Sequence, residues 1–410
     1  MSPDRVVVTG LGCISALGHN VDEFWTSLAG GRCGIGPIDV STPELAVPSP
    51  LKITIGGAIP PPDPRSLVEA RRLPMLDRFS VLAIVAAQQA LAQSGLPLER
   101  CAGRTGCIIG VGVAGWEAIE ESYRRVFLEG LRRTNVFTVP RVMPSAPASQ
   151  VSMALGIRGP VFGTSSACSS SNHAIALALC LLRSGAMDAA LVGGTEAPLI
   201  YGVLKSWEAL RVVAPDTCRP FDKNRKGLVL AEGAGVVVME RASHARARGA
   251  PILAEIAGAG MSADAADLVA PTVEGPVAAI RACLADAGLN ADAVDYVNAH
   301  GTGTVANDAT EIKVIKAVFG EAARNLSISS TKSMHGHALG ASGALELVAI
   351  VRAIQEGLIP PTVNIEEVDP DCDLDVTPNR ARERPIRVAI SNAFAFGGTN
   401  AIVAIRRFEG

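Results

Sequence analysis

Short apolar runs alternate with longer helix-like stretches along nearly the whole of this 410-residue chain. The runs at residues 6–8, 294–297 and 326–329 have the length and composition of buried strands. The stretches at residues 173–183 and 344–354 have the composition of apolar helices. This alternation is typical of proteins whose sheets are covered by helices on both faces. The sequence therefore predicts an α/β fold with largely buried sheets.

The composition restricts where such a chain works. Hydrophobic residues make up 48% of it, but no apolar run reaches the roughly 18 to 20 residues that a membrane span needs. We therefore expect no membrane span, no signal peptide, and an oligomer interface that takes up part of the apolar surface. A net charge of −3 gives no reason to expect nucleic acid. Nine scattered cysteines without a CxxC pair predict free thiols in a reducing cytoplasm.

One cysteine, Cys168, stands in a serine-rich turn between a short apolar run and the stretch at residues 173–183. Gly185, just after that stretch, is typical of a helix C-terminus. Cys168 is therefore predicted at a helix N-terminus, where free N–H groups and the helix dipole favour the thiolate. The alternative is a buried and inert cysteine. The rest of the sequence must decide between them.

Two polar segments, each after a strand-like run, contain three of the six histidines. The segment at residues 298–304 reads NAHGTGT, and the one at residues 330–337 reads STKSMHGH. Their histidines are His300, His335 and His337. A lone loop histidine is usually a surface residue, but two such segments after predicted strands indicate a functional site. They favour a reactive Cys168.

These segments resemble those of the β-ketoacyl-acyl-carrier-protein synthases, the elongating condensing enzymes of fatty-acid and polyketide synthesis. The similarity extends from VVVTGLG at residues 6–12 to NAFAFGGTN at residues 392–400, in the family's order and spacing. Within the family the chain most resembles the type II elongating synthases. The runs at residues 137–147 and 204–211 look closest to the nodulation protein E branch.

The resemblance implies a thiolase-like, duplicated α/β fold with five layers, α-β-α-β-α. It implies a first half, residues 1–250, that carries the nucleophilic cysteine, and a second half, residues 251–410, that carries the two histidines. It also implies a homodimer whose partner is an acyl-carrier protein with a phosphopantetheine arm.

The implied reaction is a decarboxylative Claisen condensation of an acyl-carrier thioester with malonyl-carrier protein. Cys168 would hold the acyl group as a thioester. As neutral rings, His300 and His337 would donate hydrogen bonds to the enolate that forms as carbon dioxide leaves. Lys332 would disfavour the imidazolium form of His337 and would pair with Glu346.

Further roles around this centre are implied by the resemblance. The backbone N–H groups of Cys168 and Phe396 would form the oxyanion hole. The other implied residues are the supporting carboxylates Asp308 and Glu311, the pantetheine-binding Thr302 and Thr304, the acyl-pocket residues Val113, Trp116, Trp207 and Phe396, and the carrier-docking Arg72, Arg125 and Arg211. No cofactor is implied, although Asn298, Glu346, Ser391 and Asn392 match positions that surround a monovalent cation in some relatives. The segment at residues 264–271 lacks the His and Thr residues common at the pocket rim of relatives.

Two other patterns point to different sites. Residues 110–115 read GVGVAG, a formal GxGxxG, but no acidic residue ends a second strand about 20 positions later, so turn glycines are expected. His335 and His337 could be half of a metal site, with Cys168 as a third ligand. Lys332 beside them would repel a divalent cation, and we expect no metal.

Two rival functions remain. A non-catalytic partner subunit, such as a chain-length factor, resembles the synthases but lacks the cysteine, and Cys168 argues against it. A thiolase or a starter enzyme primed by coenzyme A would use one histidine with a second cysteine or an asparagine. The pattern with two histidines disfavours that reading.

Overall fold

The main sheet of the computed structural model, which describes residues 4–40 and 50–410, has ten strands. Their order is β10-β9-β13-β14-β8-β1-β7-β6-β4-β5. The strands are β1 (Val6–Ser15), β4 (Thr105–Gly110), β5 (Val161–Thr164), β6 (Ala189–Glu196), β7 (Gly233–Arg241), β8 (Ala254–Ala263), β9 (Tyr296–Asn298), β10 (Ser327–Ser329), β13 (Val388–Ala395) and β14 (Thr399–Arg406). The sheet is mixed, because some neighbouring strands are parallel and others are antiparallel.

The sheet consists of two five-stranded sets with the same internal order. In the first set, β4 is parallel to both β5 and β6, and β7 is antiparallel to β6 and β1. In the second set, β9 is parallel to both β10 and β13, and β14 is antiparallel to β13 and β8. A short antiparallel pairing of Val6–Val8 with Ala254–Ile256 joins the sets. The two sets are therefore a structural repeat.

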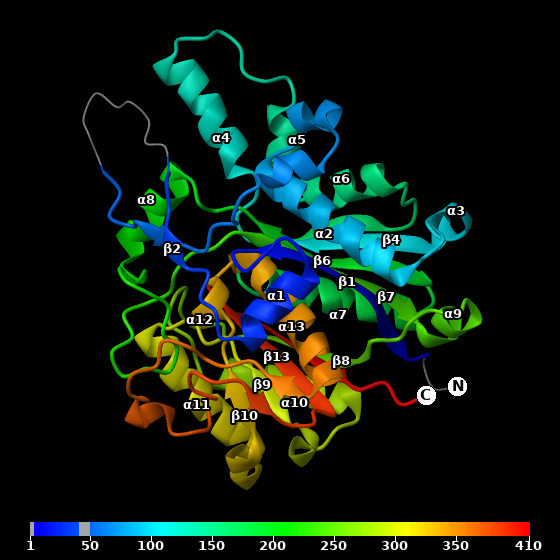
Figure 1. The fold of residues 1–410 in the computed structure, drawn as a ribbon, viewed down its shortest axis with the longest axis vertical. Helices are drawn as coiled ribbons and strands as arrows, with labels where there is room; N and C mark the ends of the chain where they lie inside the picture. Colours follow the sequence, from blue (N-terminus) through cyan, green and yellow to red (C-terminus); the bar gives the residue numbers. More distant parts are fainter. Residues whose placement is uncertain (1–3, 41–49) are drawn as a thin grey trace.

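Helices cover both faces of each set, which gives five layers (Figure 1). Two helices lie in the central layer and contact strands of both sets: α7 (Ser170–Arg183) and α13 (Ser342–Glu356). On the outside, α2 (Arg78–Ser94) and α6 (Ala146–Leu155) cover the first set, whereas α10 (Glu274–Ala287) and α11 (Val305–Phe319) lie at the second. This is the predicted thiolase-like α/β fold.

Burial on both faces explains the apolar composition. All ten residues of β1 and all eight of β6 are buried, as expected for strands between two helical layers. Among the described residues, no single helix is long and apolar enough to cross a membrane; α2 with the short helix after it passes such a test only as a pair bent by 95°.

The N-termini of the two central helices approach each other closely. A Cβ at Gly343, in the first turn of α13, would lie 2.1 Å from Oδ1 of Asn172 in the first turn of α7. A side chain at residue 343 would therefore force Asn172 out of its place. The contact brings the loop before α7 next to the loop before α13.

The remaining elements lie at the periphery or in connections. They are α1 (Val21–Ala29), α3 (Leu98–Cys101), α4 (Trp116–Tyr123), α5 (Thr138–Val142), α8 (Tyr201–Leu210), α9 (Ala242–Ala247), α12 (Lys332–His335), β2 (Gly36–Pro37), β3 (Ile55–Gly56), β11 (Leu358–Ile359) and β12 (Arg382–Glu383). Helix α4 projects from the first half of the molecule (Figure 1). Between α4 and α5 the chain exposes large apolar side chains, among them Phe127 at 76% and Val136 at 85%.

Candidate active site

Three side chains from three separate loops meet between the two halves. Cys168 lies between β5 and α7, His300 lies two residues after the end of β9, and His337 lies between α12 and α13. The Nε2 atom of His337 is 3.1 Å from Sγ of Cys168. The rings of His300 and His337 stand edge to face with centroids 5.5 Å apart. All three side chains are buried, so the site excludes most water.

Serine hydroxyl groups shape the turn around Cys168. Ala167 adopts a positive φ of 49° just before it, and α7 begins two residues after it. Ser170 Oγ accepts from the backbone N–H of Ser166 at 2.9 Å and donates to the carbonyl of Ala167 at 2.7 Å. The serine-rich sequence therefore stabilises a sharp turn that presents the sulfur.

The groups around the sulfur shift the pKa of Cys168 in opposite directions. Burial raises the pKa of the Cys168 thiol to about 12, whereas the Lys332 cation and the backbone N–H groups of Phe396 and Cys168 lower it. The sequence predicted that the helix N-terminus favours a thiolate, but burial outweighs that effect here. The resting cysteine is thus a thiol at neutral pH. The two N–H groups predicted to form the oxyanion hole both lie at this sulfur.

Both histidines are held neutral. Burial lowers the pKa of His337 well below 6.5, and the Lys332 cation adds to that effect; the same two causes act on His300. Lys332 is fully buried, and its Nζ forms an ion pair with Glu346, which is also buried. A neutral imidazole can donate one hydrogen bond and accept another. The rings can therefore act as hydrogen-bond donors at physiological pH.

Two buried carboxylates fix the loop that carries His300. Glu311 accepts from the backbone N–H groups of His300 and Gly301, each at 2.8 Å. Burial raises the pKa of Glu311 to about 7 despite these donors. Asp308 accepts from the backbone N–H of Phe221 at 2.9 Å and that of Gly303 at 3.2 Å. These contacts hold the backbone of the loop that carries His300.

A cavity of about 110 Å³ leads to Cys168 and is bordered by His300, His337, Thr302 and Thr304. The hydroxyl oxygens of the two threonines are 3.0 Å apart, so a substrate arm in the cavity can reach both. The segment at residues 264–271, which lacks the His and Thr residues common in relatives, forms part of the cavity rim through Asp267, Leu268 and Val269.

Three of the four predicted acyl-pocket residues lie near the cysteine. Val113, Trp207 and Phe396 belong to the apolar cluster that contains Cys168. The rings of Trp207 and Phe396 are stacked at 5.8 Å. The structure does not bring in Trp116, which is 40% exposed at the start of the projecting α4. Within this chain its assignment to the pocket is therefore wrong.

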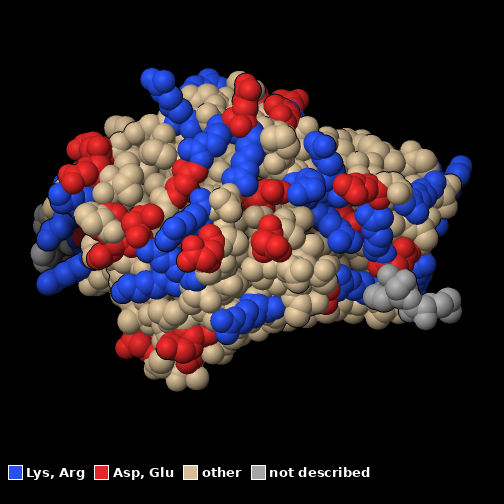
Figure 2. Space-filling view, turned by 90° about the horizontal axis from the view of Figure 1, so that it is seen from below, with Lys and Arg blue, Asp and Glu red and all other residues tan. Residues whose placement is uncertain are grey.

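The three predicted docking arginines lie in different surroundings. Arg211 ends α8 and precedes Val212, which lines the cavity at Cys168. Arg125 pairs with Glu121 at 3.7 Å, and Arg72 donates to the carbonyl of Met153 at 2.9 Å. On the face drawn in Figure 2, basic and acidic side chains are interspersed, so that face offers no basic surface for nucleic acid.

The residues assigned to a monovalent cation include two buried oxygens without a hydrogen-bond partner in the described residues, but Asn392 bonds Glu311 on the outer face of the sheet and Ser391 contacts Glu346 on the central face. The Oδ1 atoms of Asn298 and Asn392 are buried, and no hydrogen-bond partner for either lies within residues 4–40 and 50–410. Ser391 Oγ lies 3.5 Å from a carboxylate oxygen of Glu346. Neutral oxygens beside a carboxylate suit a hard cation.

His335 and His337 do not form a metal pair. His335 Nε2 bonds Thr331 Oγ1 at 3.0 Å, and its ring packs 6.0 Å from that of Phe24. The metal-binding atoms that do converge are those of Cys168, His300 and His337, all within 4.8 Å of one another. The Lys332 cation acts on all three of these groups and opposes a divalent ion there.

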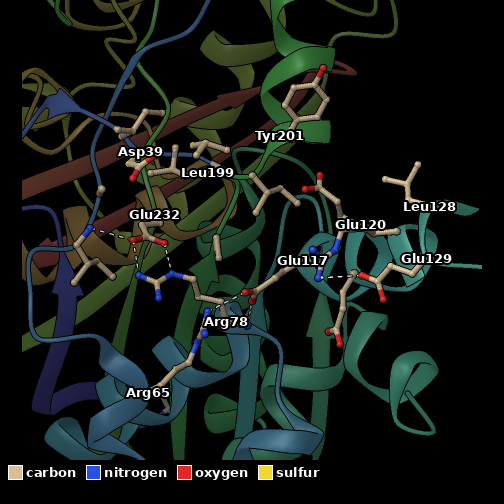
Figure 3. Close-up of a pocket in the computed structure, with 18 residues that line it drawn as sticks. Asp39, Arg65, Arg78, Glu117, Glu120, Leu128, Glu129, Leu199, Tyr201 and Glu232 are labelled. Carbon is tan, nitrogen blue, oxygen red and sulfur yellow. Dashed lines mark hydrogen bonds and ion pairs between the residues drawn. The ribbon is translucent and has the colours of Figure 1, made fainter. Parts of the chain in front are cut away.

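A larger cavity, of about 1020 Å³, lies beyond the apolar cluster and shares Leu199 and Ile200 with it. Ion pairs join Arg78 to Glu232 at 2.6 Å and Arg65 to Glu117 at 2.9 Å in its wall (Figure 3). Its lining has neither cysteine nor histidine. It is therefore not the reaction centre.

The chain matches two family descriptions: "Beta-ketoacyl synthase, N-terminal domain" over residues 3–245 and "Beta-ketoacyl synthase, C-terminal domain" over residues 253–366. It belongs to the β-ketoacyl synthase family. It is 58% identical to nodulation protein E of Rhizobium sp. (strain N33) over 404 residues, which cover 98% of this chain and 99% of the relative. It is 38% identical to 3-oxoacyl-[acyl-carrier-protein] synthase 2 of Staphylococcus aureus (strain COL) over 413 residues, which cover 99% of both.

A solved structure extends this similarity to a complex. It is described as a type II polyketide acyl-carrier protein in complex with its ketosynthase bound to the hexaketide. The matched chain superposes with a TM-score of 0.90 at 30% identity, covering 99% of this β-ketoacyl synthase and 100% of the matched chain.

The sequence reasoning missed two residues of the site. Ser342 Oγ lies 2.9 Å from Nδ1 of His337. Glu196 accepts from the backbone N–H groups of Gly112 at 2.7 Å and Gly340 at 3.1 Å, and so links the two halves. A carboxylate that ends an otherwise apolar strand was a usable signal for Glu196. Ser342 had none, because a serine in the first turn of a helix is common.

Proposed function

We propose that this synthase elongates an acyl chain on a carrier protein by decarboxylative condensation with malonyl-carrier protein. The observation that carries the proposal is the contact of Cys168 Sγ with His337 Nε2, at the end of a cavity bordered by His300. A nucleophile, two neutral donors and two backbone N–H groups then surround one point. A chain-length-factor-like subunit would lack this nucleophile.

In the first half-reaction, the sulfur of Cys168 attacks the thioester carbonyl of the acyl-carrier. A new carbon–sulfur bond forms, and the oxyanion is stabilised by the N–H groups of Cys168 and Phe396. One such donor is typically worth about 3 to 4 kcal/mol. The bond to pantetheine then breaks, and the leaving sulfur takes the proton that the cysteine has lost.

In the second half-reaction, malonyl-carrier enters the cavity beside Thr302 and Thr304. Its carboxylate leaves as carbon dioxide, and the electron pair passes to the thioester oxygen, to which His300 and His337 donate hydrogen bonds. This charge develops near the transition state, where such donors act most strongly. The enolate carbon attacks the acyl-cysteine, a carbon–carbon bond forms, and the Cys168 thiolate is released.

The residues around Cys168 and the comparisons also support proposals for the carrier protein and for the acyl chain. The name of the Staphylococcus relative and the solved complex both support an acyl-carrier partner, and we propose Arg72, Arg125 and Arg211 as its contacts. The apolar cluster beside Cys168 suits medium-to-long acyl groups. A monovalent cation near Asn298, Glu346, Ser391 and Asn392 is also proposed, supported by the buried Oδ1 of Asn298 that has no partner among the described residues.

We also propose a homodimer in a reducing cytoplasm. The exposed apolar side chains between α4 and α5 and the edge strand β5 need a partner surface, and all nine cysteines are free. Such an interface would bury about 2,000 Å² or more. Sedimentation should show a dimer at micromolar concentration; a stable folded monomer would contradict it.

The test of the function is the intact mass of the protein after incubation with a panel of acyl-carriers. We expect one acyl group per chain, mapped to Cys168, and its loss to a β-ketoacyl-carrier once malonyl-carrier is added. Cys168→Ala should gain no acyl group, whereas Cys180→Ala, which removes an exposed cysteine of α7, should behave like the parent. Acylation elsewhere, or none with any carrier, would overturn the proposal.

A further inference from the structure

The hydrogen-bond partner of His337 on the side away from the cysteine is a hydroxyl group. Ser342 Oγ lies 2.9 Å from Nδ1, and Cys168 Sγ lies 3.1 Å from Nε2. Both His337 and Ser342 are at most 2% exposed. The ring is therefore held between one hydroxyl and one sulfur, and the proton on the ring must be on one side or the other.

The need to satisfy buried groups decides which side. If Nδ1–H donated to Ser342, the hydroxyl proton would need another acceptor, and no such acceptor is found in the described part of the chain. If the hydroxyl donates to Nδ1, its proton is satisfied and Nε2 carries the ring proton. An unpaired buried donor costs about 1 to 3 kcal/mol, and an under-used oxygen acceptor is better tolerated.

We propose that Ser342 is a positioning residue that fixes His337 as its Nε2–H tautomer, a proposal that rests on the proposed condensation. The N–H then points at Cys168 Sγ, where the N–H groups of Cys168 and Phe396 also point. Three donors around the sulfur favour its thiolate during acyl transfer. Once the sulfur is acylated, the same N–H is free for the enolate oxygen of the malonyl group.

The direct test is nitrogen NMR of the protein labelled with ¹⁵N-histidine, with the His337 signals assigned by their loss in His337→Ala. We expect a protonated Nε2 and an unprotonated Nδ1 in the parent. A proton on Nδ1 would overturn the proposal. The experiment uses no substrate, so its outcome is independent of whether the proposed condensation occurs.

Variants supply a second test. In Ser342→Ala, decarboxylation of malonyl-carrier should fall about tenfold, and the midpoint of Cys168 alkylation by iodoacetamide should move to higher pH; Ser342→Thr, which keeps the hydroxyl, should restore both. Lys332 and Glu196, the charged groups that act on this sulfur, are unchanged in all of these variants.

The control is Ser27→Ala, which removes a buried hydroxyl that donates to the carbonyl of Leu17 on the α1 side of the molecule. It should lower stability without moving the alkylation midpoint. If Ser342→Ala and Ser27→Ala change stability alone, and the decarboxylation rate and the midpoint stay at parental values, Ser342 has a structural role and the proposal fails.

Discussion

Equivalent loops in the two halves of the molecule present different catalytic groups. In the first half, the loop between the edge strand β5 and the central helix α7 presents Cys168. In the second half, the equivalent loop between β10 and α13 presents Lys332 and His337. The repeat therefore brings two equivalent points together at the centre, and the sequences of the loops decide which becomes the nucleophile and which the donor.

The two halves also differ in what they bury near that centre. Around Cys168 the first half supplies mainly apolar side chains, including Val113, Leu204 and Trp207. The second half buries charged groups, which are Lys332, Glu346, Asp308 and Glu311. Buried charges are stable only when they are paired or hydrogen-bonded. Most apolar side chains of the cluster around Cys168 therefore come from the first half, which also buries Glu196 near the sulfur, whereas the second half supplies the ion pair of Lys332 and Glu346.

The largest effect is expected from breaking the buried ion pair. Lys332→Ala leaves Glu346 buried without its partner, which should lower the free energy of unfolding by about 3 to 5 kcal/mol and stop decarboxylation. The double variant Lys332→Met with Glu346→Leu should recover most of the stability but not the decarboxylation. When the solution is made more acidic, the residual release of carbon dioxide by the double variant should fall off at a higher pH than in the parent. The reason is that Lys332 no longer lowers the pKa of His337, so the ring is protonated sooner.

Lys316→Ala is the matched control, because it breaks an exposed pair with Asp373. It should cost less than about 1 kcal/mol and leave the activity unchanged. Denaturant unfolding and release of labelled carbon dioxide measure both quantities. Decarboxylation at a parental rate in Lys332→Ala would remove the lysine from the site.

A smaller, selective effect is expected in the apolar half. Val113→Phe should fill the pocket beside Cys168 and shorten the longest acyl chain that is transferred, while acetyl and hexanoyl transfer remain largely intact. Each buried methylene contributes about 0.8 kcal/mol, or about fourfold in rate. Acyl-transfer rates against chain length test this, with Val126→Phe on the outer segment as control. Profiles that superimpose for Val113→Phe and the parent would show that Val113 does not line the pocket.

A different kind of effect, on the pH dependence of stability, concerns Glu196, which links the halves. Burial raises its pKa from 4.5 to about 7, so the folded chain binds this proton more tightly than the unfolded chain. That stabilisation is complete below about pH 4 and is lost as pH rises to about 7. In Glu196→Gln, the free energy of unfolding should fall less steeply with pH over this range. The exposed Glu321→Gln should keep the parental slope, and an equal slope in Glu196→Gln would contradict the linkage.

Much of the fold could be read from local patterns. The predicted helices at residues 173–183 and 344–354 correspond to α7 and α13, which begin three and two residues earlier, respectively. The first residues of the two helices, Ser170 to Asn172 and Ser342 with Gly343, are polar or glycine and obscured those starts. The run at residues 326–329 is β10, shorter by one residue. Periodicity predicts such elements because burial imposes it.

The site was predictable where a motif marks it and not where distant segments meet. The serine turn and the two histidine segments pointed to Cys168, His300 and His337. Trp116, which the resemblance implied for the pocket, lies instead at the start of α4 with 40% of its surface exposed. The raised pKa of Cys168 depends on complete burial, which the helix N-terminus argument does not include. The contact of Ser342 with His337 could be recognised only once the structure gave the orientation of the His337 ring.

The measurement that tests the division between the halves most directly compares Cys168→Ala with His337→Ala in two assays on the same preparations. One assay is the intact mass of the acylated protein, and the other is release of labelled carbon dioxide from malonyl-carrier. We predict that Cys168→Ala gains no acyl group but still releases carbon dioxide. His337→Ala should still become acylated at Cys168 but lose release by about 100-fold or more. Parental release or condensation in His337→Ala would contradict this account.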